Sequence, residues 1–342
     1  MTIEVPVLRL GLAGYTEAQQ KLAAEAAAAA RGARARWELG AFADADAWWL
    51  EGSRTVLMSN QHLRVQPAVP SGRSVQLALA DVDRPVAFSL PITAPGFKPA
   101  VTFPIGDRDA GARVLNQFAE WMTTMLSQFA LASSIADNQP SLGSGAWEVL
   151  RGSDLLAVVD LKLGSGVMPG VTSKDFAEAS WCIRDHGAVV IPPNYARASV
   201  SLLMWQYAQR TERDLLPPHY RDQPLYFRRP PRLPQRQVKD AHLLIVRELA
   251  ANPGMNFNGL QQATGFAAEP LTRVLSALYV VGSITSNPKR AMPGGQRPRE
   301  LSAGSEQGSC SVVMDSTPRP SDLPGRPLSD MTAPLPLMPS ER

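Results

Sequence analysis

The chain has 342 residues, 44% of them hydrophobic, and a formal net charge of +3 at pH 7. This length predicts two or three folded domains and allows each a core of its own. The small net charge excludes a protein that wraps nucleic acid through charge along its whole length, although it is compatible with a local basic patch.

Residues 1–137 predict an α/β unit. Residues 5–12 have the apolar composition of a strand, and the alanine-rich helix after them can begin with a capping box between Thr16 and Gln19. Residues 35–42 and 54–59 predict two further strands. A short acidic helix that holds Trp48 and Trp49 is expected between them.

Two alternating segments follow, at residues 74–80 and 84–90. Only a few residues separate them, whereas a parallel crossover connection needs about a dozen. The two segments therefore predict an antiparallel hairpin, and the sheet of this unit is expected to be mixed.

This succession of strands and helices resembles a bacterial receiver domain. The resemblance implies acidic residues after the first strand, a phosphorylatable Asp after the third, and a Lys before a proline after the last. Here those places read "GLAG", Ser59-Asn60 and Leu90-Pro91. The resemblance therefore implies a degenerate receiver that cannot be phosphorylated in the usual way.

A long helix is predicted over residues 108–136, with Asp107 as its N-cap. Two interpretations of this helix stay open. It covers the sheet of its own unit, or it dimerises with a second copy, since two adjacent apolar stripes are more than one sheet face needs. In the dimer interpretation, the contact stripe repeats at spacings of three and four, as in a coiled coil. It consists of Leu115, Phe118, Met122, Met125 and Phe129.

Residues 145–216 predict a small α+β module. Two hairpins are expected, one over residues 146–161 and one over 179–193, followed by an amphipathic helix over 196–215. Residues 217–237 are rich in Pro and Arg, which favours an extended linker.

Residues 238–290 resemble a winged helix-turn-helix domain. Helices are expected within 238–252, 256–265 and 267–282, and the first strand of a wing follows. In the first of these helices, Leu243 and Leu249 are expected to face the core of the domain. The dense Pro, Gly and Ser of residues 291–342 predict a disordered tail.

The winged-helix resemblance implies that the third helix lies in the major groove of DNA. That helix is expected to expose Thr272, Arg273 and Ser276, of which only Arg273 is basic. Further basic residues flank the unit and could contact phosphates. The hypothetical nucleic-acid contacts are Arg228, Arg229, Arg232, Arg236, Lys239, Gln261, Gln262, Thr272, Arg273, Lys289 and Arg290.

The orientation of the flanking arginines separates two functions. Arginines aligned with the exposed face of the third helix favour DNA binding. Arginines that point elsewhere favour a winged helix that binds protein.

Catalytic patterns are sparse. Cys182, Asp185 and His186 could supply a nucleophile and a base, but Asp185 with the following glycine also suits a hairpin turn. We predict no catalytic residue, no metal site and no cofactor.

A nucleotide site is the one enzymatic alternative. Gly11 and Gly14 follow a strand and precede a helix, and Glu38 could contact a ribose. A dinucleotide fingerprint needs a third glycine, so this pattern is incomplete.

Together these features predict a non-catalytic bacterial regulatory protein, either a transcription regulator or a signalling adaptor with a winged-helix output domain. The alternative is a protein-binding scaffold that does not contact DNA, and the third is a nucleotide-dependent enzyme. DNA, a protein partner or a second copy are the expected partners. A membrane partner is not expected, because no run of 18 apolar residues occurs. Few cysteines and no basic N-terminal signal region predict a cytoplasmic protein.

Overall fold

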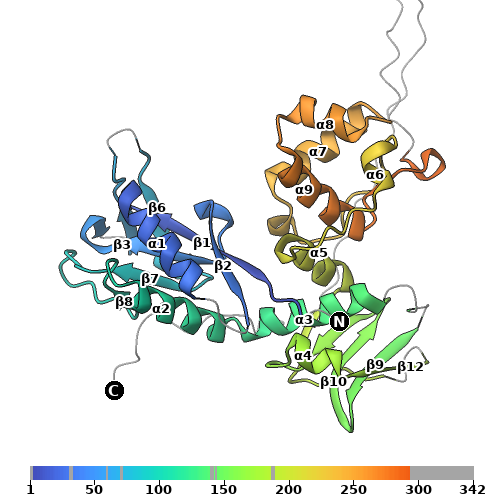
Figure 1. The fold of residues 1–342 in the computed structure, drawn as a ribbon, viewed down its shortest axis with the longest axis horizontal. Coiled ribbons are helices and arrows are strands. Elements are labelled where there is room, and N and C mark those ends of the chain that lie inside the picture. The colour runs from blue at the N-terminus through green and yellow to red at the C-terminus, as the bar shows by residue number, and fades with distance from the viewer. Residues whose placement is uncertain are drawn as a thin grey trace, which may run out of the picture.

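The computed structural model describes residues 3–30, 34–58, 61–69, 72–138, 142, 145–185 and 189–292. The chain is a mixed α/β protein with several sheets, which agrees with the predicted class at that level. An N-terminal α/β unit, a central α+β unit and a C-terminal helical unit follow one another (Figure 1). From residue 293 on, the predicted tail lies outside the described residues. Within the described part of the chain, no helix combines the length and apolar character needed to cross a bilayer.

The N-terminal unit contains a five-stranded sheet in the order β2-β1-β3-β7-β8. All its neighbouring strands are parallel. Counted along the chain, the order is 2-1-3-4-5, which is one of the common orders of doubly wound sheets. The strands are β1 (Val7–Ala13), β2 (Arg36–Gly40), β3 (Ala47–Glu51), β7 (Val86–Ser89) and β8 (Thr102–Phe103).

The predicted hairpin and mixed sheet are wrong. β6 (Val75–Ala78) pairs antiparallel with β5 (His62–Val65), and β5 pairs with β4 (Thr55–Leu57) in a separate three-stranded sheet. β7 instead lies parallel to β3. The small sheet stands within the connection from β3 to β7, which makes that connection long enough for a parallel crossover.

Trp48 and Trp49 lie in β3 and not in the predicted helix. Every residue of β3 is buried. A parallel strand covered on both faces shows no alternation of apolar and polar residues, so its sequence lacks the usual strand signal. The ring of Trp49 lies 4.2 Å from that of Phe103, measured between centroids.

Helices α1 (Glu17–Ala29) and α2 (Arg108–Trp121) pack against each other and share one core with the parallel sheet. The capping box at the start of α1 is confirmed. Asp107 caps α2 as predicted, because its Oδ1 accepts hydrogen bonds at 2.9 Å from the backbone N–H groups of Asp109 and Ala110.

The predicted long helix consists of two helices, since α3 (Thr123–Asn138) begins after a break at Met122. The residues of the predicted dimer stripe are divided between two cores of the same chain. Leu115 and Phe118 are buried beside the N-terminal sheet, whereas Phe129 is buried in the central unit. For α2 this arrangement matches the interpretation in which the helix covers its own sheet.

The central unit has an antiparallel sheet in the order β12-β9-β10-β11-β13, and α3 packs against it together with two further helices. The first predicted hairpin is confirmed, and the second is wrong because β12 pairs with β9 while residues 189–193 form no strand. The elements are β9 (Ala146–Arg151), β10 (Asp154–Asp160), β11 (Gly164–Val167), α4 (Ser173–Ala177), β12 (Ser180–Arg184), β13 (Ala196–Ala198) and α5 (Val200–Arg210).

The three helices of the C-terminal unit lie where the sequence places them: α7 (Asp240–Ala251), α8 (Phe257–Thr264) and α9 (Ala268–Val280). The strand expected after α9 is β15 (Ile284–Thr285). It pairs with β14 (Tyr226–Phe227), which lies in the segment expected to be a linker.

The segment 217–237 therefore belongs to the C-terminal unit. Its short helix α6 (His219–Asp222) holds Tyr220 in the core of that unit, and Leu225 is fully buried there. The apolar residues within a Pro- and Arg-rich stretch thus anchor it to α7, α8 and α9.

Candidate functional site

Exposed basic side chains gather where β14 and β15 meet the end of α9. The backbone N–H of Arg228 donates to Ser283 O at 2.8 Å, and that of Met292 donates to Phe227 O at 2.8 Å. These bonds bring the segment after β14 next to the short helix η5 (Pro288–Arg290). We call the basic side chains of these two segments, with Arg232 further along the first of them, the basic cluster: Arg228, Arg229, Arg232, Lys289 and Arg290.

All members of the basic cluster are exposed. Among the described residues, none of them has an acidic group within the 4.0 Å that defines an ion pair. Arg229 donates from Nη2 to Val281 O at 3.2 Å, next to the last turn of α9. A cation is favourable there because the C-terminal end of a helix carries partial negative charge.

Gly282 permits this approach. Its φ of +68° suits glycine, and a Cβ built there would lie 3.2 Å from Arg229 Nη2 and 3.5 Å from Arg228 Nη1. The turn after α9 therefore brings two guanidinium groups close to one glycine.

Two other predicted contacts, Lys239 and Arg273, are already paired with acids. Lys239 Nζ lies 3.0 Å from Asp44 Oδ1 in the N-terminal unit. Arg273 Nη2 lies 3.1 Å from Glu269 Oε1, one turn earlier on α9. These two residues therefore do not belong to the basic cluster.

The remaining predicted contacts are spread over α8 and α9. The hydroxyl of Thr272 donates to Ala268 O at 2.9 Å. On α8, Gln261 is half-buried and Gln262 is exposed. The side chain of Arg236 lies outside the described residues.

The predicted DNA-facing side of α9 is buried in part. Ser276, which the sequence placed on the exposed face, is buried at 4% exposure. α9 packs against α5, and Trp205 and Ala208 of α5 share the core of the C-terminal unit. Val280 at the end of α9 contacts the core of the central unit. In this arrangement Ser276 is not available to the bases of DNA, while Thr272 and Arg273 stay half-exposed.

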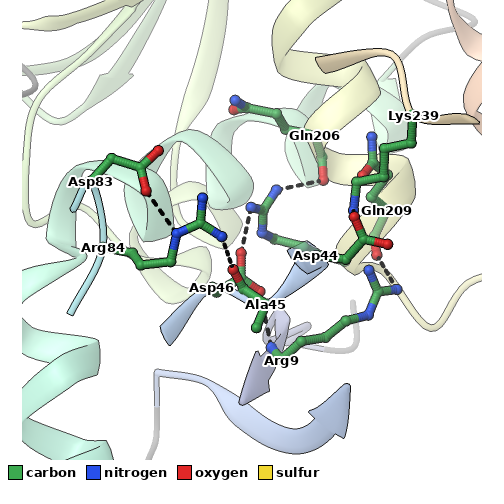
Figure 2. Close-up of polar contacts among 10 residues, drawn as sticks. Arg9, Asp44, Ala45, Asp46, Asp83, Arg84, Gln206, Gln209 and Lys239 are labelled. Atoms are coloured by element: carbon green, nitrogen blue, oxygen red, sulfur yellow. Dashed lines mark hydrogen bonds and ion pairs between the residues drawn. The ribbon is translucent and has the colours of Figure 1, made fainter. Parts of the chain in front are cut away.

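A second charged region lies between the N-terminal unit and the helices α5 and α7 (Figure 2). Asp46 Oδ1 accepts a hydrogen bond from Arg210 Nη2 at 2.7 Å, and its Oδ2 accepts one from the backbone N–H of Arg9 at 2.9 Å. Arg9 Nη2 donates to Gln209 O at 3.3 Å. We call this region the seam, formed by Arg9, Asp44, Asp46, Arg210 and Lys239.

Like charges also meet in the seam. Burial lowers the pKa of the Arg9 guanidinium, and the nearby cations Arg273 and Arg210 lower it further, while Asp46 acts in the opposite direction. Arg9 therefore repels two cations that lie on α9 and α5.

Glu4 ties the N-terminal segment to α3 and α5. Its Oε2 accepts hydrogen bonds from Tyr207 Oη at 2.8 Å and Ser133 Oγ at 3.0 Å, and lies 2.9 Å from Arg213 Nε. The hydroxyl of Thr211 donates to its Oε1. Burial, the largest cause, raises the pKa of Tyr207 to about 12. No motif marks Glu4 in the sequence, because all its partners are distant along the chain.

The nucleotide alternative is not favoured by the packing around Gly14. In sheets of this order, ligands bind at the carboxyl ends of the strands, where the first and third strands are neighbours. Here a Cβ on Gly14 would lie 2.9 Å from Val65 Cγ1 and 3.0 Å from Glu51 Cβ. β5 thus occupies the place where phosphates would lie. Glu38 is paired with Arg36 at 2.5 Å.

The predicted combination of Cys182 and His186 includes a residue, His186, that lies outside the described residues. Cys182 stands opposite Glu148 in the pairing of β12 with β9. Within the described ranges, no group of three or more His, Cys, Asp or Glu residues could hold a metal ion.

Comparison with known proteins supplies no relative for this chain. No family model matches it, and neither does a curated protein or a solved structure. The contacts and charges described above are therefore the basis for assigning a function.

Proposed function

We propose that this chain is a non-catalytic regulatory protein of the bacterial cytoplasm, a transcription regulator or signalling adaptor whose output surface is the basic cluster. The observation that carries the proposal is a group of exposed basic side chains without acidic partners among the described residues. Such a group attracts a polyanion, and the phosphate backbone of nucleic acid is the partner we favour.

The burial of Ser276 and the pairing of Arg273 favour phosphate contacts over base contacts. Reading bases needs side chains that reach base edges in a groove, whereas Ser276 is buried against the chain's own helices and Arg273 is paired with Glu269. Phosphate contacts position a protein without reading sequence. We therefore expect binding with little sequence preference.

The test is a titration of duplex DNA of random sequence, with affinity measured at increasing salt. The logarithm of the affinity should fall with the logarithm of salt by about 0.9 for each phosphate contacted. The double variant Lys289→Gln/Arg290→Gln should reduce this slope by about 2.

The matched control is Lys21→Gln/Arg64→Gln, which removes the same charge from exposed positions on α1 and β5. Its slope should equal that of the wild type. Failure of the wild type to bind at low salt, or binding without a salt slope, contradicts the proposal.

A second candidate, a protein-binding scaffold, is favoured by the position of Arg228 and Arg229 at the end of α9, away from its predicted DNA-facing side, and by the strand β4. This strand lies at the edge of its sheet. Val56 and Leu57 of β4 and Met58 directly after it are exposed at 43%, 36% and 36%. Consecutive exposed apolar residues on an edge strand are typical of a contact with another chain. Sedimentation that shows concentration-dependent self-association, together with no DNA binding, would favour this function.

A further inference from the structure

Two basic side chains on the C-terminal side of the molecule pair with acids of the N-terminal unit. Arg210 ends α5 and Lys239 precedes α7. Arg210 pairs with Asp46 and Lys239 pairs with Asp44, across the seam (Figure 2). The Arg210–Asp46 pair is well covered, since the two side chains are 20% and 13% exposed.

The carboxylates of the two aspartates bind these cations by the same kind of interaction that a phosphate group makes. A carboxylate and a phosphate oxygen both accept charge-assisted hydrogen bonds from guanidinium and ammonium groups. The acids are two residues apart in the chain, at the end of the short helix η1 (Phe42–Asp44) and just after it. A short acidic segment of the N-terminal unit thus occupies basic groups that would otherwise be open to a polyanion.

The seam is polar. Among the described residues, no apolar cluster joins the N-terminal sheet to α7, α8 or α9, because the two sides have separate cores. Interfaces of this kind allow domains to move relative to one another. Opening the seam would break ion pairs and hydrogen bonds without exposing either core.

Arg9 opposes closure of the seam. Its guanidinium donates to the Gln209 carbonyl, and Arg273 and Arg210 stand near enough to lower its pKa. The closed arrangement therefore balances two ion pairs against repulsion among three cations.

We infer that the N-terminal α/β unit masks a second polyanion-binding surface, formed by Arg210 and Lys239, and that a polyanion competes with Asp44 and Asp46 for it. This inference rests on the proposed function, because it gives the same class of partner a second surface. The unit acts as an internal competitor, and its displacement raises the affinity of the whole chain.

The test compares two changes of opposite effect in the full chain, with random duplex DNA at low salt as the probe. Asp44→Asn/Asp46→Asn removes the competing charges and should tighten binding about fivefold or more. Arg9→Gln removes the charge that Arg273 and Arg210 repel, so it should close the seam more firmly and weaken binding.

The control for net charge is Glu17→Gln/Glu25→Gln on the exposed face of α1. It adds the same charge as the aspartate variant and should leave affinity close to that of the wild type. If the double aspartate variant does not fold, Asp44→Asn alone serves, because Asp44 is half-exposed and pairs with Lys239 across the seam.

The outcomes separate the inference from the proposed function. If the wild type binds DNA and the folded aspartate variant binds no more tightly than the control, the masking is wrong and the function stands. If no variant binds DNA, both are overturned. Tighter binding by the aspartate variant alone, with weaker binding by Arg9→Gln, supports the masked surface.

Discussion

His242 is a buried titratable group on α7, whose core-facing residues were predicted to be apolar. Leu243 was expected to face the core of the first helix of this unit, but it is 54% exposed, while His242 is 4% exposed. The imidazole ring packs 4.4 Å from the ring of Trp205, and among the described residues its Nδ1 has no hydrogen-bond partner. Burial, followed by the charge of Lys239, lowers the pKa of His242 to about 4.

The free energy of unfolding should therefore depend on the protonation of His242. The unfolded chain, with a pKa near 6.5, binds a proton at a pH where the folded chain does not, so stability is lost as the pH falls through this window. The expected loss is about 2 kcal/mol between about pH 7.5 and pH 5. Denaturant unfolding followed by tryptophan fluorescence at several pH values measures it.

His242→Phe should abolish this part of the pH dependence, because it keeps a ring in the core and removes the titratable group. His219→Gln, at an exposed position, should retain it. Equal pH dependence in the wild type and in His242→Phe would show that another group is responsible.

At the scale of elements, local patterns predicted helices better than strand pairing. The capping residues Thr16 and Asp107 mark helix starts in the sequence, and both caps are present. β6 and β7 each alternate in the sequence, but nothing in either strand specifies its partner. In the structure, β6 pairs with β5 and β7 pairs with β3, and both partners lie earlier in the chain.

The packing of α9 on α5 gives a prediction at the same scale. Ser276→Arg would add a DNA-binding group if this face of α9 were open. Since Ser276 is buried, the substitution should instead lower the free energy of unfolding by about 2 kcal/mol or more. Thermal unfolding of the variant and of Thr272→Arg, one turn earlier and more exposed, makes the comparison. A Ser276→Arg variant as stable as Thr272→Arg would mean that α9 does not stay packed on α5.

At the scale of the whole molecule, the sequence marked some of the basic residues but not the residues that they contact. Arg228, Arg229, Lys239 and Arg273 stand out as basic residues near a helical unit. Their surroundings could not be predicted, because the acid that pairs with Lys239 is Asp44, in a different unit. The division of the basic residues into an open cluster and a paired group therefore emerges only from the fold.

Glu4 provides a test of how the units hold together. Glu4→Gln keeps hydrogen-bonding capacity toward Tyr207 and Ser133 but removes the ion pair with Arg213, whose side chain is 33% exposed. We expect the free energy of unfolding to fall by about 2 kcal/mol, which is less than for a fully buried pair. The exposed Glu25→Gln variant should unfold as the wild type does in the same denaturant titration.

The helix α3 contributes to two hydrophobic cores within one turn. Leu126 belongs to the core of the N-terminal unit and Phe129 to that of the central unit. These residues are about 4.5 Å apart along the helix axis. Bending the chain at the break beside Met122 would draw Leu126, which follows the break, out of the N-terminal core. Rotating the two units in opposite senses about the axis of α3 would strain the short stretch between Leu126 and Phe129. α3 therefore couples the two units, so that a movement of one is transmitted to the other.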